Sequence, residues 1–93
     1  MKKPEISFRI FNGSGPLSIY WSEGPYGDAI EAKKGNGVSW QSSNGELLGV
    51  EFDDADEDND KQVLLLENNM QVILEVKKGK ITFEVIRLKK KSA

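Results

Sequence analysis

Tight-turn signals recur along this chain at short intervals, and they constrain its fold more than any other feature. The dipeptide Asn-Gly occurs three times, at residues 12–13, 36–37 and 44–45, and Lys78-Gly79 gives a fourth reversal. Asn and Gly tolerate the positive φ angles of tight hairpin turns. Between these turns, apolar and polar residues alternate with a period of two, which is typical of strands with one buried face. The sequence therefore predicts consecutive antiparallel strands.

The alternating segments amount to about seven strands. The clearest pair is residues 71–77 and 80–88, joined through Lys78-Gly79. In the alternation of apolar and polar residues within segments 17–22 and 37–43, Trp21 and Trp40 both fall at positions predicted to face the core. The other candidates, in chain order, are residues 5–11, 17–22, 29–33 (the weakest), 37–43 and 47–52. The expected fold is all-β: a single antiparallel β-sandwich, or an open β-barrel or meander.

One segment, residues 61–68, fits two structures. As a strand, residues 62–67 are extended and Asn68-Asn69 forms a turn. As part of a short helix near residues 55–68, the segment would be capped by Asp54, with Glu57 three residues further on near the positive end of the helix. The neighbouring strand signals favour the strand.

Length and the ends of the chain indicate one small domain. The 93 residues form a single β domain over residues 1–93, with residues 89–93 as a flexible tail. The longest purely apolar run, residues 63–66, is too short to cross a membrane. Pro4 and Glu5 follow the N-terminal lysines where a signal peptide would continue with apolar residues. Since there is no cysteine for disulfides, we expect a cytoplasmic protein.

The residue types that are missing exclude much enzyme chemistry. The chain has no cysteine and no histidine. Thiolate zinc sites, cysteine nucleophiles, the commonest general base and Ser-His-Asp triads are therefore excluded. Paired carboxylates need a cleft that fixes their separation, and a small sheet leaves little room for one. We expect a non-enzymatic protein with no catalytic residues and no bound cofactor.

Charge is distributed unevenly along the chain, although the net charge is only −2. Residues 46–60 hold eight acids and no base, whereas residues 77–93 hold seven bases and one acid. These opposite charges could compensate each other, or the acids could attract a basic protein partner. For the second reading the predicted binding residues are the acids and two tyrosines expected to be exposed: Asp53, Asp54, Asp56, Glu57, Asp58, Asp60, Tyr20 and Tyr26.

Two other binding functions remain open as alternatives. Carboxylates at alternate positions can converge on Ca²⁺, and the candidate ligands are Asp54, Asp56, Asp58 and Asp60. However, Lys61 stands where calcium loops need Gly for a sharp turn. Nucleic-acid binding would use aromatic and basic residues on a sheet face, but the many acids make it less favoured. Free sheet edges could also pair two copies into a homodimer.

The middle of the chain resembles a small bacterial family catalogued as domain of unknown function 2283. The matching segments, within residues 15–56, are Leu17-Ser18-Ile19-Tyr20, Ser22-Glu23-Gly24-Pro25, Gly37-Val38, Asn44-Gly45-Glu46-Leu47-Leu48-Gly49-Val50-Glu51-Phe52 and Asp53-Asp54-Ala55. The resemblance implies a β-rich bacterial protein of unsettled activity, with members that look like accessory or antitoxin-like partners. It transfers no functional residues. The acids that usually follow the Gly-Val strand of the family are replaced here by residues 39–43, Ser-Trp-Gln-Ser-Ser.

Overall fold

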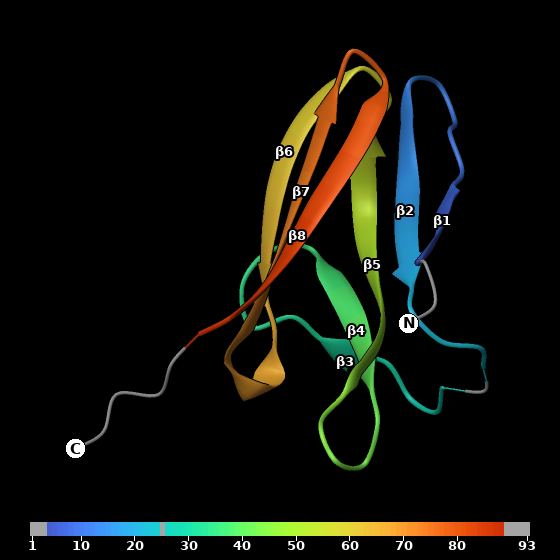
Figure 1. Cartoon of the computed structure of the whole chain (residues 1–93). Helices are drawn as coiled ribbons and strands as arrows, with labels where there is room; N and C mark the ends of the chain where they lie inside the picture. The colour runs from blue at the N-terminus through green and yellow to red at the C-terminus, as the bar shows by residue number, and fades with distance from the viewer. Residues whose placement is uncertain (1–3, 25, 89–93) are drawn as a thin grey trace.

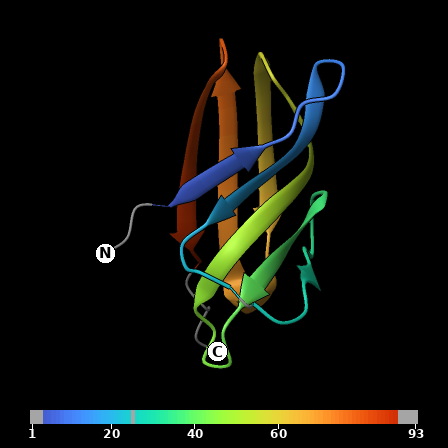
Figure 2. The ribbon, with the colours of Figure 1, turned by 90° about the vertical axis from the view of Figure 1, so that its right-hand side faces the viewer.

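The computed structural model describes residues 4–24 and 26–88, with only the backbone of residue 68. It is a two-layer sandwich in which two antiparallel sheets face each other (Figure 1, Figure 2). The larger sheet has five strands in the order β1-β2-β5-β4-β3, and the smaller has three in the order β6-β7-β8. The predicted all-β sandwich is confirmed, with eight strands and no closed barrel in the described part of the chain.

The larger sheet contains all five of the predicted N-terminal strands. Their bounds are Glu5–Phe8 for β1, Ser14–Tyr20 for β2, Ile30–Glu31 for β3, Gly37–Gln41 for β4 and Leu47–Asp56 for β5. The segment predicted as the weakest strand, residues 29–33, forms only the two-residue edge strand β3. The long strand β5 lies between β2 and β4 and pairs with both of them.

The smaller sheet resolves the ambiguity at residues 61–68 in favour of a strand. Its bounds are Asn59–Leu65 for β6, Met70–Lys77 for β7 and Lys80–Arg87 for β8, with the 3₁₀ turn η1, Glu67–Asn69, between β6 and β7. The described residues contain no α-helix, so the helical alternative is wrong. Burial alternates along this segment, as in a strand: Leu64 and Leu66 are fully buried, whereas Val63 is 39% exposed. A helix would have buried Val63 together with Leu66.

Two further sequence expectations concern the ends of the chain and the membrane. The predicted flexible tail, residues 89–93, lies outside the described residues. Over residues 4–24 and 26–88, no helix is long and apolar enough to span a membrane.

The hydrophobic core lies between the two sheets and receives side chains from both. On the larger sheet, Leu17 of β2 pairs with Phe52 of β5, and Ile19 pairs with Val50. The buried set is Leu17, Ile19, Val50, Phe52, Ala55, Leu64, Leu66, Met70, Val72, Leu74 and Val76. Burying each of the larger side chains stabilises the fold by about 1.5–3 kcal/mol relative to exposing it. The alternation of the sequence therefore appears as one face of each sheet.

A β-bulge keeps two consecutive acids out of this core. The register between β2 and β5 shifts between Gly15 and Leu17, so that Pro16 stands opposite the pair Asp53-Asp54. Proline has no N–H to donate to a ladder, and bulges are among the few places where a sheet accepts it. The extra residue on β5 restores the alternation, and Ala55 faces the core at 1% exposure.

The two tryptophans occupy different environments. Trp21 packs against the core, as predicted. On β4, Gly37 and Ser39 are the buried residues, so Trp40 points to the outer face of the larger sheet and is half-buried there. The prediction that Trp40 faces the core is wrong because only small residues fit on that side. A Cβ on Gly37 would stand 2.7 Å from Leu64 Cδ1 of the opposite sheet.

Candidate functional site

Three hairpin turns meet at one end of the sandwich, the upper end in Figure 1. The β5–β6 turn, Glu57-Asp58, lies between the β1–β2 turn, Asn12-Gly13, and the β7–β8 turn, Lys78-Gly79. Glu57 N donates to Gly13 O at 2.9 Å, and Gly79 N donates to Asp58 O at 3.0 Å. These backbone hydrogen bonds hold the acidic segment, residues 53–60, in one position between its two neighbours. We call residues 53–60 the acidic turn.

Two carboxylates of the acidic turn are used to build the turn itself. Asp56 Oδ1 accepts hydrogen bonds from Asp58 N at 2.8 Å and from Asn59 N at 3.1 Å. Asp60 accepts from Asp56 N at 2.9 Å, from Lys61 N at 2.8 Å and from Gln62 Nε2 at 2.8 Å. Side-chain to backbone bonds of this kind satisfy N–H groups that the strand ladder leaves unpaired at a reversal. Asp56 and Asp60 therefore have structural roles.

The pKa of Asp60 reflects this arrangement. Burial by itself raises the pKa of the carboxyl, but the hydrogen bonds from Asp56 N, Gln62 Nε2 and Lys61 N outweigh it and lower the pKa below the ordinary value of 3.8. Hydrogen bonds to a carboxylate favour its charged form. Asp60 is consequently ionised over the whole neutral range and holds the turn as an anion.

The structure does not bring the four predicted calcium ligands together. No group of three or more acidic side chains able to hold a metal ion occurs among the residues that the structure describes. Asp54 lies in the bulge, Asp56 ends β5, Asp58 is in the turn and Asp60 is in β6. Two of these carboxylates face their own backbone N–H groups rather than a common centre.

Basic residues lie beside the acidic turn, as the charge-compensation reading predicts. Lys78 N donates to Asn59 Oδ1 at 3.2 Å, so the β7–β8 turn touches the acidic turn directly. In the described ranges no lysine of this hairpin forms an ion pair with the acidic turn, and the side chains of Glu57, Asp58, Lys78 and Lys80 are exposed. The lysines flank the acidic turn on the β8 side only; the β1 side carries an apolar group.

That apolar group is Phe11, which the sequence analysis did not single out. Its side chain is 70% exposed, and the preceding Ile10 is 43% exposed. Phe11 N donates to Ser14 O at 2.7 Å, which fixes the backbone of Phe11 at the β1–β2 turn. Gly13 of the same turn accepts the bond from Glu57 N. A large apolar residue immediately before Asn-Gly was the available signal, because a residue at a tight turn has little sheet to cover it.

The two predicted tyrosines lie at the opposite end of β2 from the acidic turn. Tyr20 pairs with Gly49, whereas Ser14 at the other end of the strand pairs with Asp56. The ring of Tyr20 is stacked on that of Tyr26, with centroids 5.7 Å apart and planes 5° apart. The acids and the tyrosines therefore lie at opposite ends of β2, a strand of seven residues, and the structure does not bring them together.

These tyrosines belong to an aromatic cluster on the outer face of the larger sheet. Trp40 lies 6.1 Å from Tyr20 and 6.0 Å from Tyr26 between ring centroids. Gly49 pairs with Tyr20 on one side and Trp40 on the other, and a Cβ there would stand 2.9 Å from Tyr20 Cδ1. Because the three rings partly cover one another, each is half-buried and none is freely exposed.

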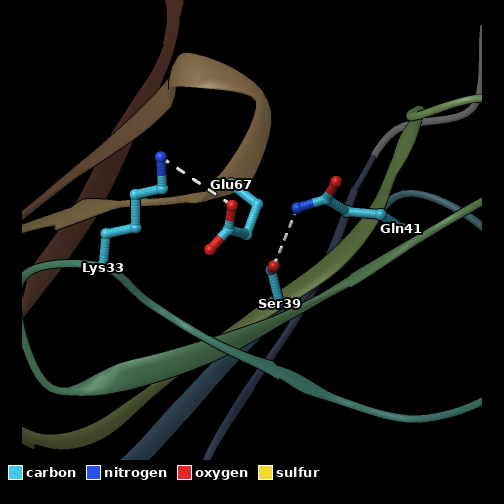
Figure 3. Close-up of polar contacts among 4 residues, drawn as sticks. All are labelled: Lys33, Ser39, Gln41 and Glu67. Carbon is cyan, nitrogen blue, oxygen red and sulfur yellow. Dashed lines mark hydrogen bonds and ion pairs between the residues drawn. The ribbon is translucent and has the colours of Figure 1, made fainter.

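A polar hollow of about 730 Å³ lies at the end remote from the acidic turn. The β4–β5 loop, residues 42–45, lines it together with Glu67 of η1 and Arg87 of β8. Figure 3 shows polar contacts nearby: Lys33 Nζ lies 3.8 Å from Glu67 Oε2, and Gln41 Nε2 donates to Ser39 Oγ at 3.2 Å. Lys33 and Glu67 are both 47% exposed, so their attraction is screened and weak.

Comparison with known proteins gives no match for this chain, whether to protein-family models, to curated proteins or to solved structures.

Proposed function

We propose that this protein is a non-enzymatic binding module that recognises a basic partner protein through the acidic turn and Phe11. The observation that carries the proposal is a 70% exposed phenylalanine in a turn that is hydrogen-bonded to the exposed acidic turn. Aromatic residues are enriched in the buried centre of protein interfaces, and polar and charged residues form the rim around it. Burying the ring would supply affinity, and the carboxylates would supply rate and selectivity.

The acids of the acidic turn have different roles, and these roles support binding rather than catalysis. Asp56 and Asp60 accept hydrogen bonds from their own backbone, so neither is poised to activate a water or a substrate. Glu57 and Asp58 project from a turn that this network holds in place. A partner therefore meets carboxylates on a backbone that is already held in place, which reduces the ordering cost of association.

The partner that fits has a basic surface with an apolar spot. An acidic cover for a basic nucleic-acid-cleaving site has this chemistry, so we extend the proposal to an antitoxin or immunity role. The resemblance of residues 15–56 to a bacterial family with antitoxin-like members points the same way. Because a chain without cysteine needs no oxidising compartment, the proposal places the protein in the cytoplasm.

Capture experiments with four variants of the full chain test this proposal. One variant removes the anchor, Phe11→Ser, and one removes two charges, Glu57→Gln with Asp58→Asn. Val63→Ser, at 39% exposure on the smaller sheet, is the apolar control. Glu31→Gln with Glu46→Gln, exposed acids outside the acidic turn, is the charge control.

A partner retained by the parent and both controls but lost by both test variants supports the proposal. Each test variant should weaken the isolated complex by about tenfold or more, as truncation of interface anchors does. A partner bound equally by all four variants would move the interface elsewhere and overturn it. Titration with Ca²⁺, and with single-stranded DNA at low salt, tests the two alternatives that the sequence leaves open.

A further inference from the structure

The two sheets differ in width, and this leaves one side of the sandwich open. On the side of β6, Lys33 N and Lys34 N donate to Leu65 O, and Leu65 N donates back to Lys34 O at 3.0 Å. The loop after β3 thus closes that side. On the other side, β1 and β8 are the edges of the two sheets (Figure 2), and the described residues contain no strand that pairs with the free side of either.

Apolar side chains line this open side. Ile6 of β1 pairs with the buried Ile19 and so faces inward, yet it is 42% exposed. Val85 of β8 pairs with the buried Val72 and also faces inward, yet it is 40% exposed. Inward-facing residues this exposed indicate that, along this side, neither sheet fully covers the apolar face of the other.

β8 presents the longest free backbone edge. It has eight residues, whereas the other free edge on this side, β1, has four. The two-residue turn Lys78-Gly79 is closed by the pair Lys77–Lys80. Hydrogen-bonded pairs alternate along an antiparallel ladder, so Lys80, Thr82 and Glu84 bond to β7. The N–H and C=O groups of the residues between them, Ile81, Phe83 and Val85, therefore point to the free edge.

The side chains of β8 are complementary to those of a second, antiparallel β8. In the register centred on Thr82, Lys80 of each copy stands opposite Glu84 of the other, and Thr82 stands opposite itself. On the inner face Ile81 stands opposite Phe83 of the other copy. Opposite charges, paired threonines and paired aromatic and branched residues are the cross-strand pairs that stabilise a sheet. The register centred on Glu84 would instead oppose two carboxylates.

We propose that two copies of this chain associate through β8, in antiparallel register centred on Thr82, to form one continuous six-stranded sheet. The arrangement is isologous, so the two equivalent Lys80–Glu84 pairs form together. It satisfies the free N–H and C=O groups of Ile81 and Phe83, which stand opposite each other, and it extends the smaller sheet on its open side. The proposal rests on β8 and uses neither Phe11 nor the carboxylates of the acidic turn, so its variants differ from those that test the proposed function.

Charge exchange on the full chain tests the proposal by analytical ultracentrifugation. The parent should shift from monomer to dimer with rising concentration. Lys80→Glu and Glu84→Lys should each raise the dimer Kd by about tenfold, because each places like charges opposite one another at both pairs. The double variant, and an equimolar mixture of the two single variants, should return the Kd to near the value of the parent.

Matched controls are available on the same sheet face. Lys61 of β6 and Glu75 of β7 are exposed and pair with each other away from the free edge of β8. Lys61→Glu and Glu75→Lys change the net charge equally and should leave the Kd unchanged. A parent that stays monomeric, a double variant that fails to recover, or controls that weaken the dimer as much as the test variants would each overturn the proposal.

Hydrogen exchange of the unmodified chain gives a second test that requires no variant. The amides of Ile81 and Phe83 should become protected as concentration rises, whereas those of Thr82 and Glu84 should be protected at every concentration. Equal exchange of the Ile81 and Phe83 amides at low and high concentration would rule out pairing through this edge.

Discussion

The ring of Trp21 meets the ring of Phe83 edge to face, with centroids 5.7 Å apart and planes at 80°. Trp21 follows β2 of the larger sheet, and Phe83 lies in β8 of the smaller sheet. The contact therefore joins the two layers near the side where β1 and β8 are the edge strands of the two sheets. Edge-to-face aromatic pairs contribute about 0.5–1.5 kcal/mol beyond the area they bury.

Removing either ring should destabilise the protein. We expect Phe83→Ala and Trp21→Ala each to lower the free energy of unfolding by about 2–3 kcal/mol, somewhat less than for fully buried aromatics. In urea unfolding, the double variant should cost about 1 kcal/mol less than the sum of the single variants. Val63→Ala, an exposed control, should cost well under 1 kcal/mol, on the order of 0.5. Strict additivity would show that the rings do not interact.

Gly15 is required for steric reasons. A Cβ at this position would lie 1.7 Å from the backbone oxygen of Arg9, which side-chain rotation cannot relieve. We expect Gly15→Ala to lower the free energy of unfolding by about 3 kcal/mol through displacement of the β1–β2 hairpin. The control is Gly24→Ala, where the nearest atom is 3.6 Å away on the ring of Tyr26. Equal thermal stability of the two variants would contradict this account.

Gly49 should show a milder and conditional effect. Its added Cβ would meet Tyr20 Cδ1 at 2.9 Å, and a side chain can move where a backbone cannot. We expect Gly49→Ala to cost about 1–2 kcal/mol and to change the fluorescence of Trp40 in a Trp21→Phe background. In a Tyr20→Ala background the same change should cost less, because the ring that it displaces is absent. An unchanged cost there would place the strain elsewhere.

Asp60 should make stability sensitive to acid. Its pKa in the folded protein is lower than the ordinary value of 3.8, so the folded state favours the ionised form. The stabilising contribution is fully present above the pKa of the unfolded chain, and it is lost as pH falls through the lower folded pKa. Urea unfolding of the parent and Asp60→Asn, followed from about pH 6 to about pH 2, measures it.

The parent should be the more stable protein at the upper end of this range, and the difference should shrink as the pH falls. A difference that stayed constant from neutral pH to acid would mean that the charge of Asp60 does not matter. Glu57→Gln, a change at an exposed neighbour in the same turn, is the matched control.

Sequence reasoning succeeded where the interactions are local. Asn12-Gly13 and Lys78-Gly79 adopt positive φ at both residues and join the strands that they were expected to join. At Asn36-Gly37 the local rule fails, because the positive φ falls at Gly35 and Gly37 begins β4. There Gly37 is required by the close approach of Glu51 O from β5 and of Leu64 from the other sheet, which no turn rule contains.

In the candidate site, too, some features are visible in the sequence and others depend on contacts between distant residues. The acidic segment is visible in the sequence, and so is the basic hairpin, but their contact through Asn59 and Lys78 depends on strand pairing between β6 and β7. Residue type alone predicts that Tyr20 and Tyr26 are binding residues. Their distance from the acids follows from the register of β2 with β5, which places the two groups at opposite ends of one strand.

The sequence alone determined that the chain is a small all-β protein, where most of its hairpins turn, and that cysteine and histidine chemistry is excluded. The tertiary structure decided which face of β4 is the core, which acids serve their own backbone, and which edge is left open. The physical reason is that a period of two defines two faces for each strand without saying which one is buried. That choice is made by the opposing sheet, through side-chain volume at contacts that are distant in the sequence.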